Sequence, residues 1–252
     1  MFFDSHAHYD DERFNEDREE VLKLLKENNI TRVVNIGADI PTSKNAINLA
    51  NKYDFIYASV GVHPHEAESM TDDDILLIKE MSKEEKVVAI GEIGLDYYYD
   101  NSPRDVQKYW FEAQLDLAKE INMPVVIHMR DATEDTISIL KNINHKDCVI
   151  HCFSGSRETA KIMLDLGYYI SFAGPVTFKN AKGILDVVSF VPDDRFFIET
   201  DCPYLTPEPN RGKRNNSIYM IDTAKKIAEI RNTTLEHIAK ITFDNASSFY
   251  RI

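Results

Sequence analysis

The sequence contains few cysteines, no long apolar run and no excess of positive charge. Its three cysteines are Cys148, Cys152 and Cys202, and an odd number in a chain of 252 residues argues against a disulfide framework and for a reducing compartment. No apolar run approaches the roughly 20 residues of a membrane helix. Asp4 and His6 interrupt the start of the chain too early for a signal peptide. We therefore expect a cytoplasmic protein without a membrane segment.

The formal net charge of −13 at pH 7 argues against a protein that coats nucleic acid through a basic surface. It leaves room for an enzyme that binds a single phosphate through a metal ion and a few local cations. No low-complexity segment and no Pro/Gly-rich linker interrupts the chain. Because 43% of its residues are hydrophobic, we expect residues 1–252 to form one domain around a large core.

Strand-like and helix-like segments alternate along the chain. Short apolar runs predict eight strands, at residues 1–3, 32–36, 55–60, 86–90, 124–127, 148–150, 168–172 and 195–198. Helical patterns lie between them, and two or three more helices follow the last strand. Eight such units predict an α/β fold, a single TIM (β/α)8 barrel with extra C-terminal helices. An open doubly wound sheet is the alternative, but the Gly-rich first turn typical of that fold is missing.

Side chains that bind metals follow most of the predicted strands. His6 and His8 are two residues apart, so in an extended chain both rings point to one side and converge on a common point. A neutral imidazole there is a good ligand for a divalent ion. In a barrel the carboxyl ends of all strands lie on one rim, where the active sites of this fold are built. The residues at these ends are His6, His8, His63, Glu92, His128, His151 and Asp201.

One shared metal site explains this recurrence. A single histidine at a strand end more often caps the backbone or faces water, and a single acid is usually solvated. Independent accidents at so many strand ends are much less credible. The nitrogen and oxygen donors together suit Zn²⁺, Mn²⁺, Mg²⁺ or a similar ion. Six donors exceed what one catalytic ion needs, so we expect two divalent metal ions, with Glu92 bridging them.

Six motif segments occur in order along the chain: His6-Ala7-His8, Gly61-Val62-His63-Pro64-His65, Gly91-Glu92-Ile93-Gly94-Leu95-Asp96-Tyr97, His128-Met129-Arg130, His151-Cys152-Phe153-Ser154-Gly155 and Glu199-Thr200-Asp201-Cys202-Pro203-Tyr204-Leu205. Together they resemble the signature segments of the TatD family, metal-dependent hydrolases of the amidohydrolase-like barrels that are usually deoxyribonucleases. The resemblance covers nearly the whole chain. It implies metal ligands at His6, His8, Glu92, His128, His151 and Asp201.

The expected chemistry is attack on a phosphodiester by a water molecule that two metal ions activate. Phosphodiester oxygens repel a nucleophile, and two cations would neutralise them, lower the pKa of a bound water and steady the leaving oxygen. We expect Asp201 and Glu92 to be catalytic. Asp201 would act as the general base and Glu92 as the bridge between the ions.

Basic residues near the same rim are candidates for binding phosphate. Arg130, two residues past His128, points to the same side in an extended strand and could pair bidentately with a phosphate, with a surface salt bridge as the alternative. His63 is expected to contact the substrate. The only dense basic cluster follows the last strand, near the usual phosphate site of this fold, and a solvated loop is its alternative. The cluster consists of Arg211, Lys213 and Arg214.

Tyrosines, cysteines and one departure from the family pattern also lie in or near these segments. Three tyrosines at residues 97–99 could stack on a base or pack against the following helix. Cys152 and Cys202 lie beside proposed ligands, and we expect both to point away from the site. Asn216-Ser217 stands where the family usually has Glu-Pro, and we expect this departure to affect local contacts of the final helical region rather than the chemistry.

We expect a metal-dependent hydrolase, and first of all a deoxyribonuclease or exonuclease that cleaves the ends of single-stranded or frayed DNA, with RNA as a further substrate. The absence of a broad basic groove favours a short strand end over a long duplex. Ester or amide cleavage, such as deacylation of aminoacyl-tRNA, is the alternative. A non-catalytic metal-binding barrel is the third hypothesis, and the complete donor set argues against it. The sequence indicates no obligatory protein partner.

Overall fold

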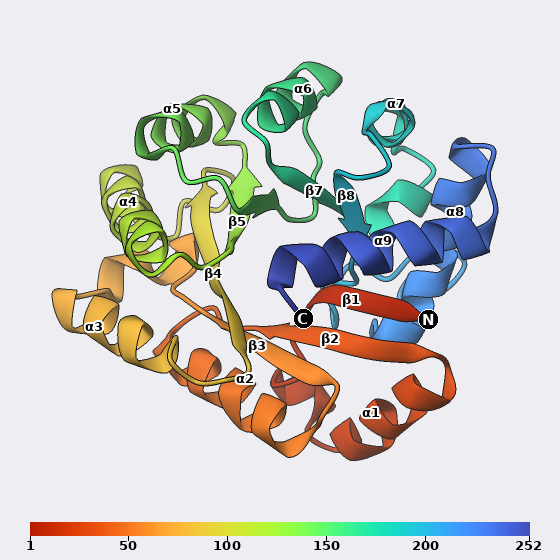
Figure 1. The fold of residues 1–252 in the computed structure, drawn as a ribbon, viewed down its shortest axis with the longest axis horizontal. Coiled ribbons are helices and arrows are strands. Elements are labelled where there is room, and N and C mark those ends of the chain that lie inside the picture. The colour runs from red at the N-terminus through yellow and green to blue at the C-terminus, as the bar shows by residue number, and fades with distance from the viewer.

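Eight parallel strands lie in chain order around the molecule. The computed structural model describes residues 1–252, and backbone hydrogen bonds from Asp201 N to His6 O (2.9 Å) and from His8 N to Cys202 O (2.8 Å) join the end of the last strand to the first. The sheet therefore curves into a nearly closed barrel (Figure 1), which confirms the predicted TIM barrel. The strands are β1 (Phe2–Ala7), β2 (Ile30–Ile36), β3 (Ile56–Val60), β4 (Val87–Asp96), β5 (Val125–Arg130), β6 (Cys148–Ile150), β7 (Tyr169–Phe172) and β8 (Phe196–Ile198).

Nine helices surround and extend this barrel. The start of α2 shows why the chain turns helical there: the Asp39 carboxylate accepts a hydrogen bond from Thr42 N (2.7 Å), and Pro41 follows the cap. No helix is both long and apolar enough to cross a membrane. The helices are α1 (Arg18–Glu27), α2 (Ile40–Lys52), α3 (Asp72–Met81), α4 (Arg104–Ile121), α5 (Thr133–Ile143), α6 (Arg157–Asp165), α7 (Lys182–Phe190), α8 (Met220–Ile230) and α9 (Leu235–Tyr250).

The last helix, α9, closes the amino-terminal end of the barrel. It packs against β1 and β8 (Figure 1), and its Phe249 and Tyr250 join an apolar cluster with Phe3 of β1 and Phe197 of β8. The Tyr250 hydroxyl donates a hydrogen bond to the Ser5 carbonyl (2.9 Å). Because this end is filled by apolar side chains, only the carboxyl-terminal rim remains for a polar site.

Strand β1 is longer than predicted and continues to Ala7. Strict alternation along a strand would place His6 on the face opposite Phe3, away from the barrel interior. A register shift between Asp4 and Ala7 interrupts the alternation. The His6 ring consequently lies in the barrel mouth, where it stacks on His151 with the ring centroids 4.1 Å apart. Strand β4 also continues past its predicted end at residue 90 and runs to Asp96, so Glu92 lies within this strand.

Asn216 and Ser217, which stand where the family usually has Glu-Pro, make specific local contacts. The Asn216 side chain caps a short 3-10 helix at Ser217–Tyr219 by accepting a hydrogen bond from Ile218 N (3.0 Å). The Ser217 hydroxyl donates to the fully buried Asp4 carboxylate (2.6 Å), which also accepts hydrogen bonds from the backbone and side chain of Thr200. Burial raises the pKa of Asp4 to about 6, although these hydrogen bonds act to lower it. This buried network joins β1, the end of β8 and the segment before α8.

Candidate metal centre

The first group of predicted ligands comes from the two strands that close the barrel. His6 Nε2 and His8 Nε2 lie 3.2 Å apart. Asp201 Oδ1 lies 3.5 Å from His6 Nε2 and 3.3 Å from His8 Nε2. Glu92 Oε2, from β4, lies 3.4 Å from His6 Nε2. Residues almost two hundred positions apart thus share one point at the barrel mouth.

The second group lies on the other side of the same carboxylate. His128 Nδ1, at the end of β5, is 2.8 Å from Glu92 Oε1, and His151 Nε2, just after β6, is 2.7 Å from the same oxygen. His128 Nδ1 and His151 Nε2 are 3.3 Å apart. The structure therefore brings together all six residues predicted as metal ligands, with Glu92 between two groups of nitrogens.

The spacing of the donor atoms fits a metal ion. Two nitrogens that each lie about 2.0–2.1 Å from a tetrahedral ion are about 3.3 Å from one another, close to the 3.2 Å between the His6 and His8 rings. His6 Nδ1 is buried without a hydrogen-bond partner, so only Nε2 of this ring makes polar contacts, and all of them are with this donor set. The residues present thus match the chemistry of a divalent-ion site.

Outer hydrogen bonds determine which ring nitrogen of three histidines faces the site. His8 Nδ1 lies 3.1 Å from the Ile36 carbonyl oxygen, which only accepts, so in the neutral ring Nδ1 carries the proton and Nε2 keeps its lone pair. His128 Nε2 donates to Asp96 Oδ2 (3.0 Å), which leaves Nδ1 for the site. A histidine held by a carbonyl or a carboxylate in this way is typical of metal ligands. His151 follows the same pattern, since its Nδ1 donates to Glu199 Oε1 (3.2 Å).

The outer nitrogen of His63 accepts a hydrogen bond, whereas those of His8, His128 and His151 donate one. Its Nδ1 accepts a hydrogen bond from the backbone N–H of His65 (3.2 Å), so in the neutral ring the proton is on Nε2. That Nε2 faces Glu92 Oε1 at 3.6 Å. Burial, together with the neighbouring imidazoles, holds the pKa of His63 well below its usual value, so the ring stays neutral. His63 therefore presents an N–H donor to the site rather than a lone pair for a metal.

The carboxylates of the site stay ionised although they are buried. Burial alone would raise the pKa of Glu92, but nearby imidazoles, His151 foremost, hold it well below its usual value. Burial alone would also raise the pKa of Asp201, but the hydrogen bond with His8 and the nearby imidazoles hold it below its usual value. Burial lowers the pKa of His8, whereas Asp201 raises it, with a net result of about 9. The site therefore attracts cations, which compete with protons for the imidazoles.

Two glycines allow the β4 backbone to approach its neighbours beside Glu92. Gly91 has φ of +154° and Gly94 has φ of +144°, which side chains disfavour. A Cβ at Gly91 would lie 2.7 Å from the Val126 Cβ, and one at Gly94 would lie 2.0 Å from the His128 carbonyl oxygen. Both contacts are too short, so only glycine permits β4 to hold Glu92 this close to β5.

A cavity of about 790 Å³ opens over the donor atoms at the barrel mouth. Arg130 lines it, and its guanidinium lies over the rings of Tyr98 (4.1 Å) and Tyr99 (4.8 Å). Cys202 is fully buried away from the cavity, as expected. Cys152, however, lines the cavity, so the expectation that it points away was wrong. Its backbone turns left-handed (φ 42°) and its N–H is held by Glu199, which brings residue 152 to the cavity wall.

The basic cluster after β8 has partners of its own outside the cavity lining. The Arg214 guanidinium pairs with Asp17 (2.6 Å) and lies over the ring of Phe14. Arg211 stacks on Phe178, with its guanidinium 3.8 Å from the ring centre. Lys213 reaches the Asn210 side chain (2.9 Å). Of the arginines and the lysine predicted to bind phosphate, Arg130 is the one that lines the cavity.

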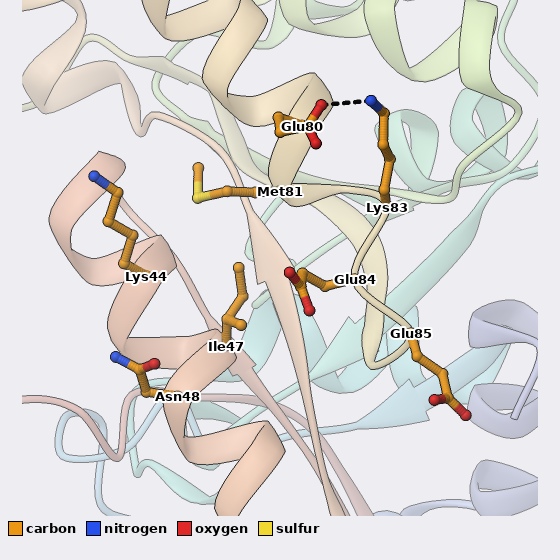
Figure 2. Close-up of a pocket in the computed structure, with 8 residues that line it drawn as sticks. All are labelled: Lys44, Ile47, Asn48, Glu80, Met81, Lys83, Glu84 and Glu85. Carbon is orange, nitrogen blue, oxygen red and sulfur yellow. Dashed lines mark hydrogen bonds and ion pairs between the residues drawn. The ribbon is translucent and has the colours of Figure 1, made fainter.

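A second hollow, of about 370 Å³, lies on the outer surface between α2 and the end of α3 (Figure 2). Charged side chains of both signs line it, among them Lys44, Lys83 and Glu84. None of the predicted site residues contributes to this hollow. The groups of side chains that could hold a metal ion lie instead at the barrel mouth.

A protein-family model described as "TatD related DNase" matches residues 3–251. The chain belongs to the TatD family. It is 50% identical over 254 residues to the "Uncharacterized metal-dependent hydrolase YabD" of Bacillus subtilis (strain 168), with 100% of both chains covered. This TatD protein is therefore a metal-dependent hydrolase, in agreement with its donor set.

Two further relatives extend the comparison. The "3'-5' ssDNA/RNA exonuclease TatD" of Pantoea ananatis (strain LMG 20103) is 33% identical over 257 residues, which cover 98% of each chain. The crystal structure of YJJV, a TatD homolog from Escherichia coli k12, matches with a TM-score of 0.94 and 28% identity, and the match covers 100% of this chain and 98% of that one. Both the sequence and the barrel of the TatD family thus extend over the entire chain.

Two carboxylates that hold the predicted ligand histidines were not singled out from the sequence. Asp96 is fully buried, and its two oxygens accept hydrogen bonds from His65 Nε2, His128 Nε2 and the backbone of Tyr98 and Tyr99. Asp96 lies four residues after Glu92 in the same strand, and this even spacing was the available signal. Glu199, two residues before Asp201, holds His151 in the same way.

Asp96→Asn is expected to weaken metal binding by about 10- to 100-fold, because the amide would turn a donor toward the N–H of His128 and disturb its orientation. A competition titration against a chromophoric chelator measures this affinity. The matched control is Asp135→Asn, since Asp135 pairs with Tyr97 and Lys108 away from the donor atoms and should leave the affinity unchanged. Equal affinities in both variants would show that Asp96 does not orient the ligand.

Proposed function

We propose that this TatD family member is a nuclease that uses two divalent ions to remove nucleotides from the ends of single-stranded DNA, with RNA as a second substrate. The observation that carries the proposal is the position of Glu92, whose Oε2 faces His6 and whose Oε1 faces His128 and His151. Two groups of donors around one carboxylate suit a pair of ions, an arrangement used for in-line attack on phosphoesters.

The residues around the donors suit the steps of such a reaction. Cations bound there would neutralise the phosphate oxygens and make water more acidic. Asp201 lines the cavity as an ionised carboxylate and takes the proton of the attacking water. His63 Nε2–H donates a hydrogen bond to a phosphate oxygen. Arg130 uses the face of its guanidinium against Tyr98 and Tyr99, which leaves its in-plane N–H donors for a second oxygen.

The family and the surface charge support a short single strand as the substrate. The matching family model is described as a DNase, and the Pantoea relative is named as a single-strand exonuclease. The net charge of −13 leaves little long-range attraction for an extended duplex. Local contacts at the cavity therefore have to supply the affinity for one strand end.

A substrate panel tests the proposal. The purified protein with Mn²⁺, Mg²⁺ or Zn²⁺ is given end-labelled single-stranded DNA, single-stranded RNA and blunt duplex DNA of the same sequence. We expect mononucleotides from the single strands, slower release from the duplex, and no release after treatment with a chelator. The products are resolved on a denaturing gel.

The same panel includes aminoacyl-tRNA. Release of the amino acid without shortening of any strand would replace the nuclease proposal by the deacylase alternative. Tight metal binding without hydrolysis of any substrate would instead favour a non-catalytic barrel. Shortening of single strands that is lost in Asp201→Asn would support the nuclease.

A further inference from the structure

Two exposed tyrosines face the metal centre from opposite sides of the cavity. Tyr99 follows β4 and Tyr204 follows β8, four strands apart in an eight-stranded barrel, and both line the cavity. Tyr99 is 55% exposed and Tyr204 is 46% exposed. Large aromatic faces left in water beside a polar site are suited to binding a flat ligand.

Tyr99 is attached rigidly to a metal ligand. Its backbone N–H donates to Asp96 Oδ1 (2.9 Å), and the other oxygen of that carboxylate holds His128 (3.0 Å). The edge of the His65 ring packs against Tyr99, with ring centroids 5.3 Å apart. The Arg130 guanidinium lies over the ring at 4.8 Å. The position of this aromatic ring relative to the donor atoms is therefore set by hydrogen bonds rather than by a flexible loop.

Tyr204 is attached in a similar way on the other side. Its backbone N–H donates to the Asp201 carbonyl oxygen (2.9 Å), and its hydroxyl donates to Asp11 Oδ2 (3.4 Å). The Arg13 guanidinium lies over its ring at 4.1 Å. Both tyrosines thus have an arginine over the ring. The Arg13 guanidinium also pairs with the Asp11 carboxylate (2.8 Å), so Arg130 is the one of the two that offers positive charge to the phosphates of a strand passing these rings.

We propose that Tyr99 and Tyr204 are stacking platforms for two unpaired bases, one on each side of the phosphate that the metal centre holds. This inference rests on the proposed nuclease function and specifies its substrate as a strand with free bases on both sides of the cleaved bond. Every base has a flat π face, so the platforms accept any sequence. Bases inside a duplex are already stacked on one another and cannot occupy both platforms.

Steady-state kinetics of Tyr99→Ala and Tyr204→Ala test the proposal on an end-labelled single-stranded oligonucleotide and on one whose last two nucleotides lack their bases. For the complete oligonucleotide we expect each variant to raise KM by about 10-fold or more, with kcat within about 3-fold, because stacking contributes to binding and not to the bond cleavage. Tyr→Phe at either position should restore KM. For the oligonucleotide without the end bases, the variants and the unmodified protein should have the same KM.

Tyr109→Ala is the matched control. Tyr109 is 59% exposed on α4, packs edge-on against Trp110 and lies outside the cavity lining, so its loss should leave both kinetic constants unchanged. Cleavage with the same KM in all three alanine variants would overturn the stacking proposal and leave the nuclease proposal intact.

Fluorescence anisotropy with a labelled single strand and Mn²⁺ measures the affinity of each protein for the strand without requiring cleavage. Absence of cleavage by the unmodified protein contradicts the nuclease function. Binding that weakens by about 10-fold in Tyr99→Ala and Tyr204→Ala, but not in Tyr109→Ala, would still support the platforms. Binding of equal strength in every protein, or no binding at all, would overturn them.

Discussion

Glu92→Gln is expected to lose at least one divalent ion and to lower hydrolysis by more than about 1000-fold. The carboxylate has one oxygen for His6 and the other for His128 and His151. Glutamine would replace one of these oxygens by an amide that donates hydrogen bonds and would remove the negative charge that a pair of cations needs. Metal analysis of the purified variant by mass spectrometry, together with single-strand cleavage rates, measures both effects.

Glu120→Gln makes the same chemical change outside the site. Glu120 is largely exposed and pairs with Lys79 on the surface, so this variant should keep its metal content and its activity. A Glu92→Gln protein with two bound ions per chain and undiminished cleavage would contradict the bridging role. Circular dichroism spectra that match the unmodified protein would exclude unfolding as the cause of a loss.

Asp201→Asn is expected to lower kcat by more than about 100-fold while the barrel stays folded. An asparagine amide cannot take the proton of the attacking water, although its oxygen can still face His6 and His8. Asp201 has φ of +55°, a conformation that asparagine adopts readily, so the backbone should tolerate the change. Single-turnover cleavage at saturating metal separates the proton-transfer step from metal binding.

Asp131→Asn is a closely matched control for this substitution. Asp131 also follows a barrel strand and has φ of +52°, but it is exposed and does not line the cavity. Its replacement should leave kcat within about 2-fold. Comparable kcat values for Asp131→Asn and Asp201→Asn would show that another group accepts the proton.

The convergence of the six predicted metal ligands was predictable because it depends on a simple rule of the fold. Residues that follow parallel strands meet at one rim, and this rule correctly placed His128 and His151 beside Glu92. The positions of the basic residues were less predictable. Arg130 ends β5 and Arg214 lies in the segment that follows β8, but Arg130 stacks on tyrosines at the cavity, whereas Arg214 pairs with Asp17. The residues next to either arginine in the sequence do not indicate which of these partners it contacts.

The sequence by itself determined the barrel and the set of side chains at its rim, because apolar strands, amphipathic helices and the residues that follow each strand are local features. Only the tertiary structure decided which nitrogen of each ring faces the site. That choice depends on a hydrogen-bond acceptor or donor brought from elsewhere in the fold: Ile36 for His8, Asp96 for His128, Glu199 for His151. A one-dimensional pattern cannot place such partners, since their distance in space is set only when the barrel closes.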